Sequence, residues 1–278
     1  MQAESWNPRP RMWWAGPAIV YLGSLASLIL NRAAGQIADT FISYIALQAL
    51  VFAIPLSVII FCVKALESTS FWSSTGFGKT SWRRIALYTL ILNFLSFLLS
   101  ALLFSAGEYL TPRLPEGARY DPGAVHTAFQ GLPRAAYWYM IFTSVVYAGF
   151  GEEVTFRGYI LTRLLRKGQV FAIITSALMW SSLHLWYLPT LGSTGIWQHI
   201  DVFLTGILFG VVYVKARSIL PLIIVHGFAD ILLPLSFLYP DGAVDTGAFI
   251  VLILGLLTTA GFTIYWLYRR FVRPHSLA

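Results

Sequence analysis

Charged residues are scarce in this chain. Only 11% of its 278 residues are Asp, Glu, Lys or Arg, whereas a soluble globular domain carries about 25%. Hydrophobic residues make up 57% of the chain, and its mean hydropathy is +0.69. This balance excludes an ordinary soluble domain and predicts a membrane protein whose residues 1–278 form a single transmembrane domain.

Cysteine is nearly absent as well. The single Cys62 lies in an apolar run, so the chain can form neither an internal disulfide nor a thiolate metal cage. The net charge is +7, but the basic residues come in short clusters between apolar runs. Such clusters are typical of membrane topology. We therefore expect the lipid bilayer as a partner, and no nucleic acid.

Long apolar segments are abundant. A helix that spans a membrane needs about 20 mostly apolar residues. Candidate segments lie at roughly 13–30, 41–63, 85–106, 135–151, 170–187, 200–214, 218–238 and 247–268. The expected fold class is therefore all-α, a polytopic membrane protein with about eight transmembrane helices around an intramembrane active-site cavity.

Basic residues also predict the orientation of these segments, because short cytoplasmic loops are enriched in Lys and Arg. Arg9 and Arg11 precede the first segment, and every second loop after it is basic. The basic residues of those loops are Lys64, Lys79, Arg83, Arg84, Arg163, Arg166, Lys167, Lys215, Arg217, Arg269, Arg270 and Arg273. We expect both termini in the cytoplasm, and a prokaryotic inner membrane as the location.

The first polar cluster is an EExxxR pattern formed by Glu152, Glu153 and Arg157. An ionisable side chain inside a span costs about 2.5–3.5 kcal/mol, so each needs a partner or a purpose. On a helix, residues four apart share a face, which lets Glu153 pair with Arg157. Glu152 lies about 100° away around the helix axis, so it takes no part in this pair and remains available for another role.

Two further polar motifs lie in later segments, one with His184 and one with His226 and Asp230. His184 follows Trp180 by one helical turn, and on its own it would be read as a structural histidine near the membrane interface. His226 and Asp230 are four apart, so they share a helix face. That pair alone could equally tie two helices together.

The combination indicates more than its parts. Two adjacent acids, an arginine and two histidines on three segments supply a general base, a charge partner and oxyanion donors. Water attack on an amide bond needs this inventory. Residues 135–235 are therefore the predicted catalytic motif region.

These motifs resemble those of the CAAX-processing and bacteriocin-processing (CPBP) intramembrane proteases, relatives of the prenyl-protein endopeptidase that processes CAAX proteins. The family's EExxxR matches Glu152, Glu153 and Arg157; its aromatic-xxx-His matches Trp180 and His184; its HxxxN/D matches His226 and Asp230. The family has an architecture of the eight-helix type, consistent with the apolar segments.

The resemblance implies a role for each residue. Glu152 would activate a water with His184, while His226 and position 230 would stabilise the oxyanion and Glu153 and Arg157 would organise the site. Two positions depart from the usual pattern: Trp180 replaces phenylalanine, and Asp230 replaces the asparagine of the prenyl-protein protease. An ionised aspartate cannot donate to an oxyanion. Asp230 would have to be protonated, orient His226, or bind something cationic.

Metal dependence and substrate stay open at this point. Two histidines and a glutamate could ligate zinc, which takes three protein ligands and a water in catalytic sites, but the chain has no HExxH helix. We favour a glutamate-dependent protease without a cofactor, with a metalloprotease as the alternative. The expected substrate is a membrane-associated or prenylated (CAAX-type) peptide or protein. The competing hypothesis is a non-catalytic membrane protein, such as an immunity factor, scaffold or transporter.

Overall fold

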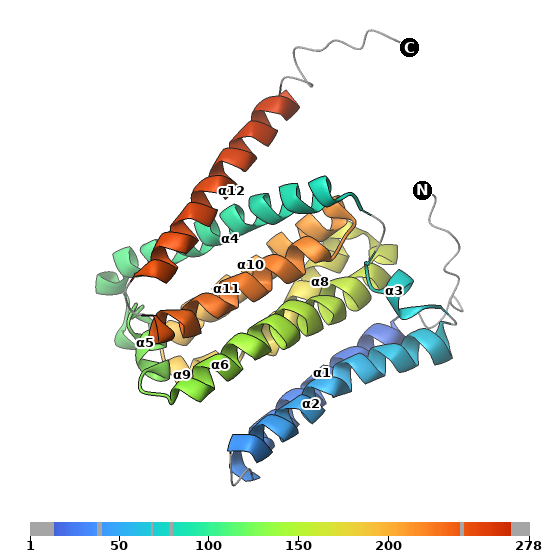
Figure 1. Ribbon diagram of the computed structural model, residues 1–278, viewed down its shortest axis with the longest axis horizontal. Coiled ribbons are helices and arrows are strands. Elements are labelled where there is room, and N and C mark those ends of the chain that lie inside the picture. Colours follow the sequence, from blue (N-terminus) through green and yellow to red (C-terminus); the bar gives the residue numbers. More distant parts are fainter. Residues whose placement is uncertain (1–13, 38–40, 68, 78–79, 240–241, 268–278) are drawn as a thin grey trace.

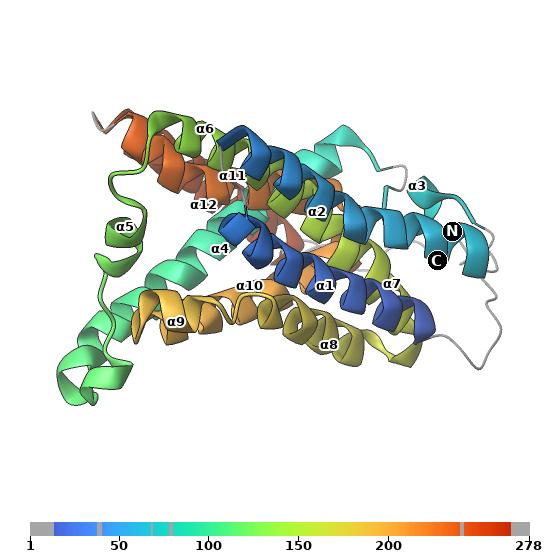
Figure 2. The same cartoon turned by 90° about the horizontal axis from the view of Figure 1, so that it is seen from below.

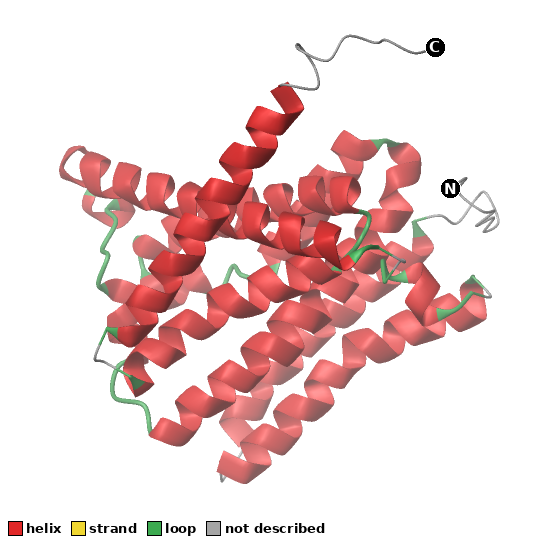
Figure 3. Cartoon of the chain, turned by 45° about the horizontal axis from the view of Figure 1, so that its top comes forward, coloured by secondary structure: helices red, strands yellow, loops and turns green. Residues whose placement is uncertain are grey.

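The protein is helical throughout its described part. The computed structural model describes residues 14–37, 41–67, 69–77, 80–239 and 242–267, and these contain no strand. Helices account for nearly all of the described chain, and short loops join their ends (Figure 3). The all-α fold class is therefore confirmed.

The elements follow one another with few long connections. The first group consists of α1 (Ala15–Ile37), α2 (Phe41–Phe61), η1 (Cys62–Leu66), α3 (Phe71–Ser74), α4 (Trp82–Leu110), η2 (Thr111–Arg113), η3 (Glu116–Ala118) and α5 (Ala124–Phe129). The second group consists of α6 (Arg134–Thr143), η4 (Ser144–Glu152), η5 (Val154–Leu161), α7 (Thr162–Leu164), η6 (Leu165–Lys167), α8 (Gln169–Ser182), α9 (Tyr187–Leu191), α10 (Thr194–Ala216), α11 (Leu220–Leu238) and α12 (Ala243–Leu267).

The second group forms the centre of the molecule. Helix α11 packs against α6, η4 and α4, while α10 packs against α8, α9 and α4. Helices α1 and α2 pack on each other and flank the η4–η5 segment, and α12 crosses α4 at the opposite side (Figure 1). Seen from below, α5 lies in the connection between α4 and α6 (Figure 2). The predicted catalytic motifs therefore lie on elements that are surrounded by other helices.

Three described helices are long and apolar enough to cross a membrane: Trp82–Arg113, Thr194–Ala216 and Leu220–Leu238. Shorter apolar helices lie at Ala15–Asn31, Phe52–Leu66, Gln169–Ser182 and Ile253–Tyr265. These helices support a membrane protein, while the count of eight spans stays a prediction. Arg9, Arg11, Lys79, Arg269, Arg270 and Arg273 lie outside the described residues, so the orientation of the termini is also untested.

One expected segment ends earlier than predicted. The apolar run suggested a span over residues 170–187, but α8 ends at Ser182 and a turn follows before α9. The amides of Leu183 and His184 bond to carbonyls only three residues back, which tightens the chain out of the α-helical path. His184 therefore lies in a turn beside the helix end and not within a spanning helix.

A close helix contact brings the motifs together. A Cβ atom on Gly149 would lie 2.9 Å from the carbonyl oxygen of Ile223 and 3.1 Å from the Cα of Gly227. Only glycine allows the η4 backbone and α11 to approach this closely. Since Glu152 and Glu153 follow on the chain after Gly149, and His226 precedes Gly227, this approach places the first and third motifs in contact.

The segment that carries the glutamates is wound as a π-helix. Both η4 and η5 have this form, and Glu153 joins them. Such windings occur mostly as single turns within α-helices, frequently at functional sites. The wider winding does not disturb the expected pair, since Glu153 and Arg157 remain in contact.

Candidate active site

Glu153 is the buried centre of the cluster. Its Oε1 accepts a hydrogen bond from Nη1 of Arg157 at 2.8 Å, and the side chains of both residues are fully inaccessible to solvent. The same oxygen lies 2.8 Å from Nδ1 of His226, on α11. A carboxylate can only accept, so Nδ1 of His226 carries the proton of this bond. The pairing of Glu153 with Arg157 expected from the sequence is confirmed.

Arg157 is also held by aromatic rings. Its guanidinium carbon lies 4.2 Å from the centroid of the Trp180 ring and 5.4 Å from that of Phe209. An arginine over the face of a tryptophan gains a cation–π attraction that grows as the pair is desolvated. Arg157 therefore joins the first motif to the second, because Trp180 belongs to α8.

Glu152 faces away from this buried pair, as its helical position predicted. Nε1 of Trp180 donates a hydrogen bond to Oε2 of Glu152. Glu152 is 9% exposed, whereas Glu153 is fully buried. The two adjacent glutamates therefore have different environments: one is enclosed by cationic and aromatic groups, and the other reaches a cavity.

His184 is oriented by the backbone of α8, the helix that ends just before it. Its Nδ1 lies 3.1 Å from the carbonyl oxygen of Trp180. A carbonyl can only accept, so Nδ1 bears the proton and, in the neutral ring, Nε2 carries the lone pair. This arrangement leaves Nε2 able to take up a proton. Trp180 thus contacts Glu152 through its side chain and His184 through its backbone.

His226 and Asp230 form the third motif, on α11. Nε2 of His226 is 3.6 Å from Oδ2 of Asp230, an ion-pair distance longer than a hydrogen bond. The Asp230 side chain is 43% exposed, in contrast to the 9% of His226. The two ring nitrogens of His226 therefore face two different carboxylates, one buried and one open to a cavity.

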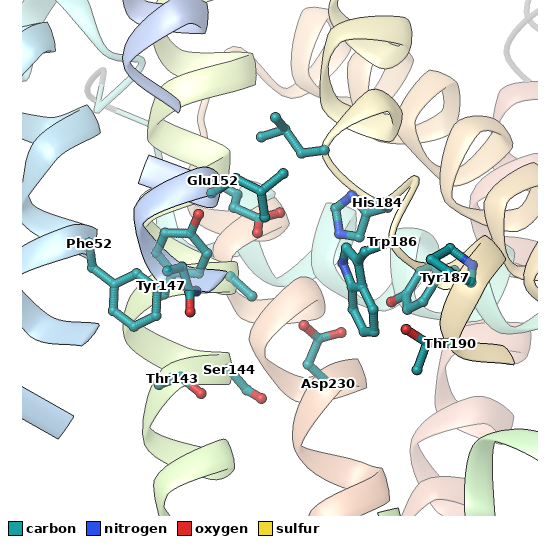
Figure 4. Close-up of a pocket in the computed structure, with 15 residues that line it drawn as sticks. Phe52, Thr143, Ser144, Tyr147, Glu152, His184, Trp186, Tyr187, Thr190 and Asp230 are labelled. Carbon is teal, nitrogen blue, oxygen red and sulfur yellow. The ribbon is translucent and has the colours of Figure 1, made fainter. Parts of the chain in front are cut away.

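A cavity of about 670 Å³ opens beside these residues. Glu152, His184 and Asp230 reach it from three different elements, together with Tyr147 and Tyr187 (Figure 4). Glu153 and Arg157 lie behind this surface, since both are fully buried. The six predicted residues are therefore brought together in two layers, with three side chains at the cavity and the others behind them.

Two tyrosines of the cavity had no signal in the sequence. Tyr147 stacks on Phe52 of α2, with ring centroids 3.9 Å apart, and the Tyr187 ring lies 5.7 Å from that of His184. Both look like ordinary aromatic residues of an apolar run. Tyr147 precedes the EExxxR motif by five positions, but nothing in that spacing distinguishes it from a packing residue.

One basic residue of a predicted cytoplasmic turn is buried. Arg163 was expected among the basic residues of a cytoplasmic turn, and its side chain is only 3% exposed and pairs with Glu67 at 2.5 Å. Tyr159 donates a further hydrogen bond to Glu67 at 2.7 Å, and Arg163 also bonds to the carbonyl of Ser74. Arg163 therefore joins α7 to the connection between α2 and α4.

The described side chains offer no ready metal cage. Among them, no group of three or more His, Cys, Asp or Glu side chains is arranged to hold a metal ion. Nδ1 of His226 already bonds to Glu153, and Nδ1 of His184 bonds to a carbonyl. These Nδ1 contacts leave Nε2 of each histidine open, as in ligating histidines, but no group of three such ligands is formed among the described residues, as the zinc site considered from the sequence would need.

Comparison with known proteins connects this geometry to a family. No curated protein matches the chain. The family model described as type II CAAX prenyl endopeptidase Rce1-like matches residues 134–232. That stretch contains all three motifs, from the EExxxR segment through Trp180 and His184 to His226 and Asp230. The family resemblance drawn from the motifs is confirmed: residues 134–232 of this chain are similar to the Rce1-like type II CAAX prenyl endopeptidases.

Proposed function

We propose that the protein is an intramembrane endopeptidase that hydrolyses a peptide bond in a membrane-associated or prenylated (CAAX-type) substrate. One observation carries this proposal: Glu152 and His184 line the same cavity, and both are held by Trp180. The cavity is bordered by Leu220–Leu238, a helix long and apolar enough to cross a membrane, and by the shorter apolar helix Ala15–Asn31, so a substrate anchored in lipid could reach it. Residues 135–235 are the proposed catalytic region within one transmembrane domain.

Glu152 serves as the general base in this proposal. Trp180 engages Oε2 of Glu152, and Oε1 is then the oxygen that can accept a proton from a water in the cavity. The water oxygen bonds to the carbonyl carbon as its proton passes to Glu152, and the carbonyl π electrons move onto oxygen. A positioned base of this kind contributes about 10²–10⁴-fold to a rate.

His184 assists at the leaving nitrogen, and His226 assists at the oxyanion. Nε2 of His184 takes up the proton that Glu152 removed from the water and delivers it to the leaving nitrogen as the oxyanion electrons re-form the carbonyl and the carbon–nitrogen bond breaks, which returns Glu152 and His184 to their starting protonation states. His226 donates from Nδ1 to Glu153, so it needs a second proton on Nε2 to donate to the oxyanion. Asp230, 3.6 Å from Nε2, is placed to stabilise that doubly protonated ring. The orienting role of Asp230 is thereby favoured over direct donation.

Glu153 and Arg157 position these groups and do not touch the substrate. Their buried pair sets the distance between η5 and α11 through His226. We further propose a prokaryotic inner membrane as the location, with both termini in the cytoplasm. The basic clusters between apolar segments support that orientation.

Cleavage of a panel of quenched peptides, including farnesylated CAAX peptides, tests the proposal in detergent-purified protein. Wild type is compared with Glu152→Gln and with the matched control Glu116→Gln, which changes an exposed glutamate that does not line the cavity. We expect Glu152→Gln to lower kcat by about 10²–10⁴-fold, and Glu116→Gln to behave as wild type. A chelator is added in parallel.

Each outcome of this assay has a definite meaning. Cleavage that depends on Glu152 and resists the chelator supports a glutamate-dependent protease, whereas chelator sensitivity restores a metalloprotease. Equal residual cleavage by wild type and Glu152→Gln would remove Glu152 from the mechanism. A wild-type protein that cleaves no member of a broad panel favours the competing non-catalytic function.

A further inference from the structure

A second, smaller cavity lies against the other side of the site. It has a volume of about 240 Å³ and shares His184, Tyr187 and Asp230 with the larger cavity. Glu152 lines only the larger of the two, and His226 lines only the smaller. The two cavities therefore adjoin at His184 and Asp230, next to the position where a peptide bond would be cleaved.

The smaller cavity carries acidic charge. Asp201 on α10 and Asp230 on α11 both line it. Oδ1 of Asp201 accepts a hydrogen bond from Ser100 on α4 at 2.8 Å, which supplies no positive charge. The described lining residues include no lysine or arginine, and the doubly protonated His226 proposed above offsets only one of the two carboxylates, that of Asp230. A carboxylate placed within an apolar span needs a partner, and the hydrogen bond described for Asp201 comes from the neutral hydroxyl of Ser100.

A serine on the same wall is also unsatisfied. Ser96 precedes Ser100 by one helical turn on α4 and lines the same cavity. It is 9% exposed, and its Oγ is buried without a hydrogen-bond partner among the described residues. Buried hydroxyl groups are nearly always hydrogen-bonded in native proteins. Ser96 is thus an independent sign that a polar group from outside the described chain belongs here.

We propose that this smaller cavity is a subsite for a basic side chain of the substrate, close to the scissile bond; this inference rests on the proposed protease function. A lysine ammonium has three donors and no acceptor. The cavity offers acceptors in the carboxylates of Asp201 and Asp230 and in the hydroxyl of Ser96. Hydrogen bonds between ionised partners are roughly twice as strong as neutral ones. The apolar stem of the lysine would lie along Phe97, Val202 and Phe209, which line the remaining wall.

Two arms of one experiment test the subsite. The first arm measures binding by fluorescence anisotropy to the Glu152→Gln protein, with peptides that carry lysine or its uncharged isostere norleucine at each position in turn. The second arm measures kcat/KM of the wild-type enzyme on the same peptides. At one position we expect lysine to be favoured about tenfold over norleucine in both arms.

Variants of Asp201 decide where the preference comes from. Asp201→Asn removes the charge but keeps the shape, and we expect it to abolish the preference for lysine in both arms, while Asp201→Glu keeps it. The control Glu116→Gln removes an exposed negative charge elsewhere and should leave the preference intact. If Asp201→Asn does not fold, Ser96→Ala serves as the milder variant and should reduce the preference.

The outcomes separate this inference from the proposed function. Equal binding of lysine and norleucine peptides at every position, no binding of any lysine peptide, or a preference that survives Asp201→Asn would overturn the subsite. A wild-type protein that cleaves peptides without any basic preference would retain the protease function and lose the subsite. If no peptide is cleaved, the proposed function fails, and the binding arm still decides the subsite.

Discussion

Nδ1 of His226 lies 2.8 Å from Oε1 of Glu153, two residues 73 positions apart in the sequence. This bond joins α11 to the π-helical segment that carries the catalytic motif. Because the same oxygen binds Arg157, Glu153 holds a cation on its own helix and an imidazole on another. This one carboxylate oxygen therefore fixes the position of His226 relative to Arg157.

Loss of Arg157 should destabilise the protein. Arg157→Ala leaves the carboxylate of Glu153 buried without its cation, and breaking a buried pair in this way costs about 3–5 kcal/mol. We expect a clearly lower midpoint of thermal unfolding in detergent, with little folded protein at the temperature where wild type is stable. The control Arg83→Ala removes an exposed arginine and should unfold as wild type does. Equal midpoints for the two variants would contradict a stabilising role for the Arg157–Glu153 pair.

Trp180→Phe tests the hydrogen bond to Glu152. Phenylalanine is usual at this position in the resembled family, and it keeps the ring while losing the indole N–H. A hydrogen bond to a charged group contributes about 1.5–3 kcal/mol. We therefore expect kcat to fall by roughly 10–100-fold, because Glu152 loses the contact that orients it, and the unfolding midpoint to fall only modestly, because the aromatic ring is kept. Unchanged kcat would show that the indole N–H does not position Glu152.

Asp230→Asn separates the two contributions proposed for this residue. Asparagine keeps the shape and still places a side-chain oxygen near Nε2 of His226, so cleavage of an uncharged peptide should stay within about tenfold of wild type. The preference for a lysine peptide should weaken, because one of the two carboxylates of the smaller cavity is lost. Asp230→Leu, which cannot bond to His226, should lose cleavage of both peptides. An Asp230→Asn enzyme as inactive as Asp230→Leu would mean that the carboxylate itself is required.

Gly149→Ala tests the close approach of α11. The added methyl carbon would lie 2.9 Å from the carbonyl oxygen of Ile223, so the helices must separate. Overpacking of this kind costs about 1–3 kcal/mol, and we expect both a lower unfolding midpoint and a lower kcat as His226 moves away from Glu153. The matched control is Gly247→Ala on α12, where a methyl group would meet nothing within 4 Å. Wild-type activity and stability in Gly149→Ala would show that α11 can shift without moving the site.

Much of the site followed from local rules. A chain poor in charge and rich in long apolar runs has to satisfy its backbone hydrogen bonds within helices, so the all-α class was readable from composition. Helical geometry alone placed Glu153 with Arg157 and turned Glu152 away. The three motifs together indicated the same family that the model matching residues 134–232 describes.

Contacts between helices were not readable in the same way. That His226 bonds to Glu153 depends on which helices pack together and on how each is rotated about its axis, and the close approach at Gly149 decides both. The turn that frees His184 from α8 is another tertiary feature, since the apolar run continues unbroken past Ser182. Arg163 is a further example. The sequence placed it among the basic residues of a loop, but it is buried in an ion pair with Glu67, which is distant in sequence.

The sequence by itself determined the helical class, the membrane character and the identity of the polar residues, because these follow from composition and from the period of a single helix. Only the tertiary structure decided that Trp180 holds both Glu152 and His184, that Tyr147 and Tyr187 border the larger cavity, and that Asp201 and Ser96 face a second one. The physical reason is that helical periodicity relates residues within one segment. The relation between segments is set by close packing, which no local pattern encodes.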